Sequence, residues 1–267
     1  MKLISCLAVL TVGIAASPTF AFAGNIVLEG SDATADHFDA PYTTQLFTYL
    51  QGGSSKKVLV LGGVHLSPSV STGQYTLASG YSLTGYTLSD YSAVYIESVG
   101  GCCTQADTSI SAGDQALIGT AEGLGLNLSI ENYGGGPSWG AILPAALNAL
   151  PDSDFAGLGD FGSGSGPGCT DNEVFTPFAL SAGFTQPPVL GCYEHQAYLL
   201  APFTALGFNS LVTADPSYFE GQPASALLAF GGVLGGGDAP TPEPSSLVLL
   251  GTGALGVIGA FRRRLMA

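Results

Sequence analysis

The chain of 267 residues carries 20 acidic and 6 basic side chains, which gives a formal net charge of −14 at pH 7. Between residues 24 and 240 the only cations are Lys56 and Lys57, so nucleic acid and anionic lipid headgroups are disfavoured as partners. The hydrophobic content of 46% is ample for a core, and 39 Gly with 16 Pro fall below the level typical of disordered chains.

Residues 1–23 have the pattern of a secretory signal peptide. A basic residue precedes an apolar run over residues 3–16, which is shorter than the ~20 residues that a spanning helix needs. The small residues Ala21 and Ala23 then form the kind of box that signal peptidase recognises. We therefore expect signal peptidase to cut after Ala23, which leaves an exported domain over residues 24–238.

The first half of this domain has the pattern of alternating strands and helices. Tyr42, Leu46 and Tyr49 fall near one helical face and predict a helix over residues 42–50. For the polar stretch at residues 67–91 we expect loops or short surface strands. Apolar runs predict buried strands at residues 25–29, 57–61 and 93–97.

The alternation continues to the end of the domain. Ser111 is a predicted N-cap for a helix over residues 113–124, with Asp114 in its first turn. The segment "LNLSIE" predicts a further buried strand, and "NSLVTAD" and "ASALLAFGG" predict the last two. We also expect helical structure at residues 139–150, 175–182 and 194–206, and a Gly- and Ser-rich loop at residues 154–172.

This order of elements predicts an α/β fold with a mostly parallel sheet flanked by helices. The segments "VLVLGG", "AVYIESVGG" and "ALLAFGG" resemble the flavodoxin-like layout of class I glutamine-amidotransferase-like and ThuA-like domains. The resemblance implies a fold and not an activity. The Gly-x-Cys-x-Gly nucleophile turn of the amidotransferases and their downstream His-x-Glu do not occur in this chain.

Four cysteines remain after removal of the signal peptide: Cys102, Cys103, Cys169 and Cys192. An even number in an exported chain favours disulfides over metal thiolates. Because adjacent cysteines rarely bond each other, we expect Cys102 and Cys103 to pair with the two later cysteines, in either arrangement. Such oxidation argues against the alternative of a thiol nucleophile with His65 or His195 as its base.

Carboxylates near predicted strand ends are the candidates for acid–base chemistry. In open α/β sheets, ligands bind beyond the carboxyl ends of the strands. The sequence places Glu97 and Glu131 there, and a disulfide would bring Glu194 and His195 close to them. Paired carboxylates suit the hydrolysis of glycosidic bonds, although acids at strand ends are often hydrogen-bonded to loop backbone instead.

Asp32, Asp36 and Asp39 lie close enough in the chain to supply oxygen ligands for calcium. Their spacing matches neither an EF-hand nor a nonapeptide repeat, and polar turns that cap a following helix have the same composition. We therefore expect no cofactor and keep calcium as the alternative. The Ser-, Thr- and Tyr-rich residues 67–91 suit sugar faces, while the lone Trp139 is expected in the core.

The tail at residues 239–267 has three parts. An apolar helix is expected over about residues 246–261; its ~15 apolar residues span ~23 Å, which is short for a hydrocarbon core of ~30 Å. Arginines hold that end in the cytoplasm by the positive-inside rule. Prolines keep the segment before the helix extended and open to a protease. The flanking residues are Pro242, Glu243 and Pro244 on one side and Arg262, Arg263 and Arg264 on the other.

This tail resembles the PEP-CTERM sorting signal of Gram-negative bacteria, which implies a membrane protease, exosortase, as a partner that cuts near the motif. The chain is then anchored transiently in the inner membrane before it reaches the cell surface or the extracellular space. The leading functional hypothesis is a non-enzymatic structural or polysaccharide-associated role. The competing hypothesis is an extracytoplasmic hydrolase with an amidotransferase-like or ThuA-like fold.

Overall fold

The structure is a computed structural model of the whole chain. The signal peptide, the four cysteines and the tail considered above lie outside the residues that it describes. The described residues are 24–34, 39–62, 66–97, 110–132, 139–157, 174–185, 195–214 and 216–230.

Within these ranges the strands form one nine-stranded sheet in the order β3-β2-β4-β5-β1-β9-β7-β6, with β8 paired to β9. The strands are β1 (Ile26–Glu29), β2 (Val58–Leu61), β3 (Tyr75–Leu77), β4 (Ala93–Ile96), β5 (Asn127–Glu131), β6 (Phe155–Gly157), β7 (Gln196–Leu199), β8 (Phe208–Ala214) and β9 (Ala224–Phe230).

The sheet has a parallel and an antiparallel half. Strands β3, β2, β4, β5 and β1 are all parallel to their neighbours. From β1 onward the pairs β1–β9, β9–β7, β7–β6 and β9–β8 are antiparallel. The α/β expectation is confirmed, and the sheet is mixed and largely parallel rather than wholly so.

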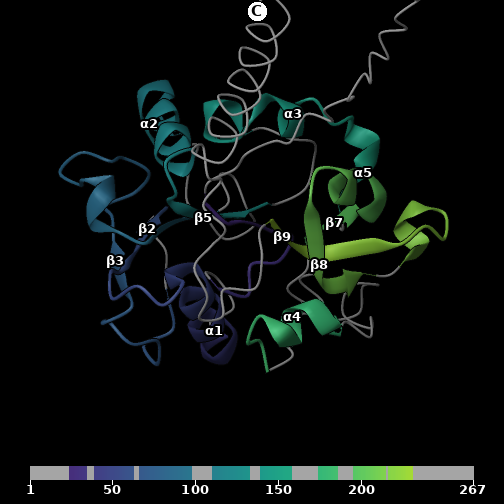
Figure 1. The fold of residues 1–267 in the computed structure, drawn as a ribbon, viewed down its shortest axis with the longest axis horizontal. Helices are drawn as coiled ribbons and strands as arrows, with labels where there is room; N and C mark the ends of the chain where they lie inside the picture. Colours follow the sequence, from purple (N-terminus) through teal and green to yellow (C-terminus); the bar gives the residue numbers. More distant parts are fainter. Residues whose placement is uncertain are drawn as a thin grey trace, which may run out of the picture.

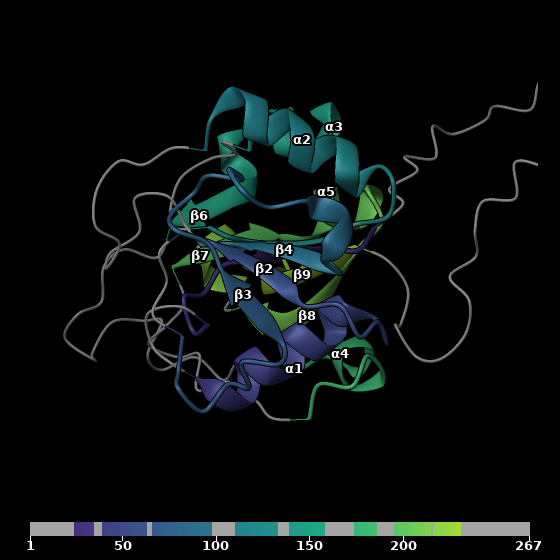
Figure 2. The same cartoon turned by 90° about the vertical axis from the view of Figure 1, so that its left-hand side faces the viewer.

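Helices cover both faces of the sheet (Figures 1 and 2). On one face lie α1 (Ala40–Gln51) and α4 (Pro177–Ser181). On the other lie α2 (Ala112–Glu122), α3 (Ala145–Asn148) and α5 (Leu200–Ala205). Each face has its own core: Phe47 and Tyr95 pack on the α1 side, and Ile118 and Tyr198 pack on the α2 side.

Local capping explains where the two long helices begin. The Asp39 side chain accepts a hydrogen bond from the backbone N–H of Tyr42, and Pro41 stands in the first turn of α1, where its missing N–H is not needed. The Ser111 side chain accepts from the backbone N–H of Asp114 at the start of α2. The predicted Ser111 cap is therefore confirmed.

Two expected elements differ from the structure. Residues 196–199 of the expected helix form strand β7, and only Leu200–Ala205 are helical. Residues 155–157 of the expected loop form strand β6, which pairs with β7. Both differences have one physical reason, because a run of only three or four residues takes its conformation from a partner strand distant in sequence.

The elements that follow β1 and β5 in the described chain lie on opposite faces of the sheet. After β1 the chain enters α1 on one face, whereas after β5 it reaches the 3₁₀ turn at Gly140–Ile142, which packs on α2 on the other face. Adjacent strands whose connections diverge in this way define the switch point at which open α/β sheets bind ligands. In the described part of the chain, no helix has the length and apolar character needed to cross a bilayer.

Candidate functional site

Three glutamates lie at the carboxyl ends of neighbouring parallel strands. Glu29 ends β1 and Glu131 ends β5, and the two residues are partners in the parallel register. Glu97 directly follows β4, whose last residue is paired with the residue before Glu131. All three are at most 3% exposed. We call Glu29, Glu131 and Glu97 the acidic row.

The acidic row lies on the α1 face of the sheet. Side chains alternate along a strand, so Glu29 shares a face with Val27, and Glu131 shares a face with Ser129. Val27 belongs to the core beneath α1, and the Ser129 hydroxyl contacts Glu29. The row is therefore enclosed between α1 and the sheet, at the switch point between β1 and β5.

Glu29 is fully buried and accepts hydrogen bonds from three hydroxyl groups. Tyr42 donates to Oε2 over 2.9 Å, Thr34 donates to the same oxygen over 3.5 Å, and Ser129 donates to Oε1. Burial raises the pKa of Glu29 from 4.5 to about 7, although the three hydroxyls act in the opposite direction. Burial, and then the charge of Glu29, raise the pKa of Tyr42 well above 10, which keeps its hydroxyl a donor.

His195 and Asp32 form a buried pair next to the end of β1. His195 Nε2 lies 2.7 Å from Asp32 Oδ2, an arrangement that places the imidazole proton on Nε2. The backbone N–H groups of His195 and Gln196 donate to the Gly30 carbonyl over 2.6 and 2.8 Å. A Cβ on Gly30 would collide with the carbonyl of Gln196, so this approach of β1 to β7 needs glycine.

Glu97 also depends on a glycine. Gly62 directly follows β2 and lies beside Glu97, with φ of 136°, a backbone conformation that glycine tolerates best. A Cβ at position 62 would collide with the Cβ and the carboxylate of Glu97. The Gly that follows the apolar run of β2 therefore makes room for the glutamate of the next strand.

The structure brings together some of the predicted site residues. Glu97 and Glu131 lie at the carboxyl ends of their strands, and His195 lies beside the end of β1; any catalytic role for them stays a prediction. Asp32 contacts His195, and Asp39 caps α1; calcium binding by these residues stays a prediction. Among the described residues, no group of three His, Cys, Asp or Glu side chains is arranged to hold a metal. Outside the described ranges lie Glu194, His65, Asp36 and the four cysteines.

Sequence reasoning missed Glu29, the most enclosed acid of the row. The sequence pattern that could have revealed it was present, because Glu29 ends the first apolar run just as Glu97 and Glu131 end later ones. Its partner Tyr42 carried no such signal, since an aromatic residue on the apolar face of a helix is expected in the core. Trp139 is buried as expected and donates from Nε1 to Asn132 over 2.9 Å.

A pocket of about 430 Å³ opens at the opposite, amino-terminal edge of the parallel strands. The loops that lead into β2, β4 and β5, with the ends of α1 and α2, supply its lining, and we call it the amino-edge pocket. Its lining residues are Gln51, Ser54, Lys56, Leu88, Ser89, Tyr91, Ser92, Ala121, Leu124, Gly125, Leu126 and Asn127.

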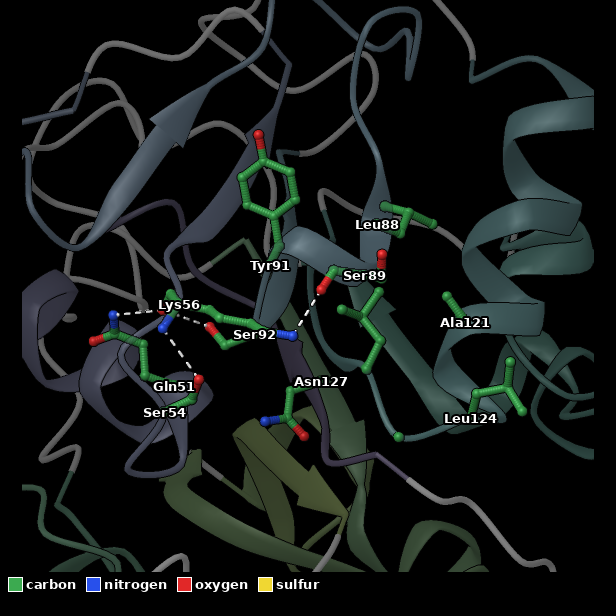
Figure 3. A pocket seen from close by; sticks show the side chains of 12 residues that line it. Gln51, Ser54, Lys56, Leu88, Ser89, Tyr91, Ser92, Ala121, Leu124 and Asn127 are labelled. Atoms are coloured by element: carbon green, nitrogen blue, oxygen red, sulfur yellow. Dashed lines mark hydrogen bonds between the residues drawn. The ribbon is translucent and has the colours of Figure 1, made fainter.

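The amino-edge pocket has a polar and an apolar side. Figure 3 shows Gln51, Ser54 and Lys56 on one side and Ala121 and Leu124 on the other. Leu124 is 83% exposed, although leucine is usually buried. The Tyr91 ring points away from Lys56, so the apolar side is aliphatic rather than aromatic (Figure 3).

Together these elements define an α/β protein with an enclosed acidic row at the carboxyl ends of its parallel strands and an open pocket at their amino ends. In a comparison with known protein families, residues 240–264 match the PEP-CTERM protein-sorting motif. No curated protein and no solved structure matches the chain.

The chain therefore carries a PEP-CTERM sorting motif at its C-terminus, as the Pro-Glu-Pro, apolar and arginine segments predict. Proteins with this motif are exported from bacteria, processed by exosortase and sorted at the cell surface. The likeness of the body to amidotransferase-like and ThuA-like domains stays a prediction, as does the signal peptide.

Proposed function

We propose that this exported protein binds polysaccharide at the cell surface without hydrolysing it. The observation that carries the proposal is the lining of the amino-edge pocket, which combines hydroxyl, amide and ammonium groups with exposed leucine. Sugars present the same mixture of hydroxyl groups and apolar C–H faces. None of the described lining residues is Asp, Glu, His or Cys, the side chains that most often carry acid–base or nucleophilic steps.

Internal hydrogen bonds hold the polar side of the pocket in place. Gln51 Nε2 donates to the Lys56 carbonyl over 3.0 Å, and the Lys56 backbone N–H donates to Ser54 Oγ over 3.1 Å. Lys56 Nζ donates to the Ser89 carbonyl over 2.7 Å, and an ammonium group has two further donors for a ligand. A wall that is ordered before binding loses less conformational entropy when a ligand arrives.

The net charge of the chain favours neutral over anionic polysaccharides. A chain with a net charge of −14 repels polyanions at long range, and a single lysine in the pocket does not offset that field. The pocket volume of about 430 Å³ lies within the ~300–1,000 Å³ typical of small-ligand sites. We therefore assign neutral saccharides, bound a few sugar units at a time, as the ligand class.

Two pairs of variants test this proposal with neutral gluco-oligosaccharides as probes and calorimetry as the readout. Lys56→Ala removes a lining residue, whereas Lys57→Ala removes the neighbouring lysine, whose Nζ donates to Thr72 outside the pocket. Leu124→Ser and Leu117→Ser alter two exposed leucines, of which only Leu124 lines the pocket. We expect Lys56→Ala and Leu124→Ser to weaken binding about tenfold and the two controls to leave it unchanged.

Equal effects within each pair, or tighter binding of oligogalacturonate than of the neutral probes, would contradict the assignment. If no oligosaccharide tested binds, the polysaccharide proposal is wrong. A purely structural role at the cell surface would then remain.

A hydrolase is the second candidate, favoured by one specific observation. Glu29, with a pKa of about 7, stands beside Glu131 at the switch point of the sheet, and acids of shifted pKa often mark catalytic sites. The enclosed position of the row and the three hydroxyl donors to Glu29 favour a structural role for it. Turnover of chromogenic glycosides or esters that Glu131→Gln abolishes, and that exposed Glu220→Gln preserves, would establish the hydrolase instead.

A further inference from the structure

Glu122, the last residue of α2, is a carboxylate in an unfavourable place. It is 3% exposed, and the C-terminal end of a helix carries a partial negative charge that repels an anion. Among the described residues its Oε1 has no hydrogen-bond partner. Burial raises the pKa of Glu122 from 4.5 to about 7. A nearby cation would relieve each of these penalties.

Gly24 contacts the side chain of Glu122. Its backbone N–H donates a hydrogen bond to the Glu122 carboxylate. Gly24 is buried, and a Cβ there would collide with the Leu126 carbonyl, so the backbone nitrogen is held close to the carboxylate. The next residue, Asn25, is fixed to β5 through its N–H, which donates to Asn127 Oδ1 over 2.8 Å.

Gly24 is also the residue that signal-peptide removal exposes, if the cleavage predicted from Ala21 and Ala23 occurs. Signal peptidase adds one water across the Ala23–Gly24 amide. Ala23 leaves with the new carboxylate, and Gly24 keeps the amine, which takes up a proton. An α-amino group has a pKa of about 7.7–8.0, so it is largely cationic at neutral pH.

We propose that Glu122 is the receiving site for the mature N-terminus, with the Gly24 ammonium and the Glu122 carboxylate forming a buried ion pair after processing. The single N–H of the precursor is replaced by three donors and a positive charge at the same position. The pair offsets the charge of Glu122 and gives Oε1 a donor. The processed domain is then more stable than the same domain within the precursor, so full stability follows export.

Amine labelling tests the pair directly, because a chain that begins at Gly24 has only three amines: the Gly24 α-amine, Lys56 and Lys57. The chain is produced by export in a bacterial host, kept with its tail in mild detergent, and treated with formaldehyde and cyanoborohydride at pH 7. Mass spectrometry then reports each amine separately. We expect Lys56 and Lys57 to react while Gly24 reacts at least about tenfold more slowly than in denaturant.

The matched variants are Glu122→Gln and Glu220→Gln; Glu220 is exposed in a turn. We expect Glu122→Gln to raise the labelling rate of Gly24 about tenfold and Glu220→Gln to leave it unchanged. Equal protection in the wild type and in Glu122→Gln would overturn the proposal, since burial alone would then protect the amine. A mature chain that begins at any residue other than Gly24 would overturn it as well.

A second measurement serves if Glu122→Gln does not fold. A chain that begins one residue earlier, at Ala23, displaces the ammonium from the carboxylate. We expect its unfolding equilibrium constant to rise at least about tenfold over that of the Gly24 chain, since separating a buried pair is strongly destabilising. Equal stability of the two chains would contradict the ion pair and would leave the saccharide proposal untouched.

Discussion

Tyr42 on α1 donates a hydrogen bond over 2.9 Å to Glu29, the buried last residue of β1. This bond links the first helix to the strand at the centre of the mixed sheet. A hydroxyl that donates to a buried carboxylate contributes more to the free energy of unfolding than one that donates to a neutral group. When the hydroxyl is removed, no water molecule takes its place as donor to the carboxylate.

The Tyr42→Phe variant should therefore lower the free energy of unfolding by about 1.5–3 kcal/mol at pH 8, where Glu29, with a pKa of about 7, is mostly ionised, as measured by urea denaturation. Tyr49→Phe on the same helix is the matched control. Tyr49 is also buried, but its hydroxyl has no hydrogen-bond partner among the described residues. We expect Tyr49→Phe to be neutral or slightly stabilising. Equal losses in the two variants would mean that the bond to Glu29 contributes nothing particular.

The pKa of Glu29 sets the sign of a pH dependence. Its pKa is about 7 in the folded chain and near 4.5 when unfolded, so the folded state holds the proton more tightly between these values. The resulting stability is complete below about pH 4.5 and is lost as the pH rises through 7, by at most about 3 kcal/mol.

The Glu29→Gln variant should flatten this part of the stability profile between pH 4.5 and 7.5, whereas Glu220→Gln should not. Urea denaturation at four or five pH values measures both. A wild-type contribution from Glu29 that grows with rising pH would show that the carboxylate, and not the acid, is the favoured buried form.

Gly62 tests the geometry around Glu97. Gly62→Ala places a Cβ against the Cβ and the carboxylate of Glu97 and also strains a φ of 136°. We expect it to lower the free energy of unfolding by about 2–4 kcal/mol. Gly85→Ala is the control, because Gly85 has φ of 87° but open space around its Cβ position, so strain alone should cost about 1 kcal/mol. Equal losses of unfolding free energy in Gly62→Ala and Gly85→Ala would show that the Glu97 side chain does not lie against position 62.

Local signals predicted most of the parallel half of the sheet. Apolar runs ended by glycine located β2 and β4 closely, and the Ser111 cap located the start of α2. These features depend on residues adjacent in sequence, which is why a pattern along the chain reveals them. The expected positions of Glu97 and Glu131 at strand ends followed from the same runs.

Long-range pairing explains what the sequence did not reveal. The "QAYLL" run leads directly into helix α5, and only its ladders with β6 and β9 make residues 196–199 a strand. The hydrogen bond of Tyr42 to Glu29 spans 13 residues, and the pair of His195 with Asp32 spans 163. The amino-edge pocket was not predicted at all, because its residues come from separate loops and element ends that no shared pattern connects.

The four cysteines provide a test of the exported state. An even number in an exported chain predicts two disulfides, so thiol labelling in denaturant without reductant should find no free cysteine among Cys102, Cys103, Cys169 and Cys192. Labelling after reduction should find all four. Two or more thiols that label before reduction would revive the hypothesis of a cysteine nucleophile.

The intact mass of the protein recovered from the surface of its native cells tests the central claim most directly. The claim is that an N-terminal signal and the PEP-CTERM motif at residues 240–264 together deliver this α/β domain outside the cell. The account predicts a chain that begins at Gly24 and lacks the arginine-terminated helix of the tail. A chain that retains residues 1–23 or ends with Arg262, Arg263 and Arg264 in place would contradict it.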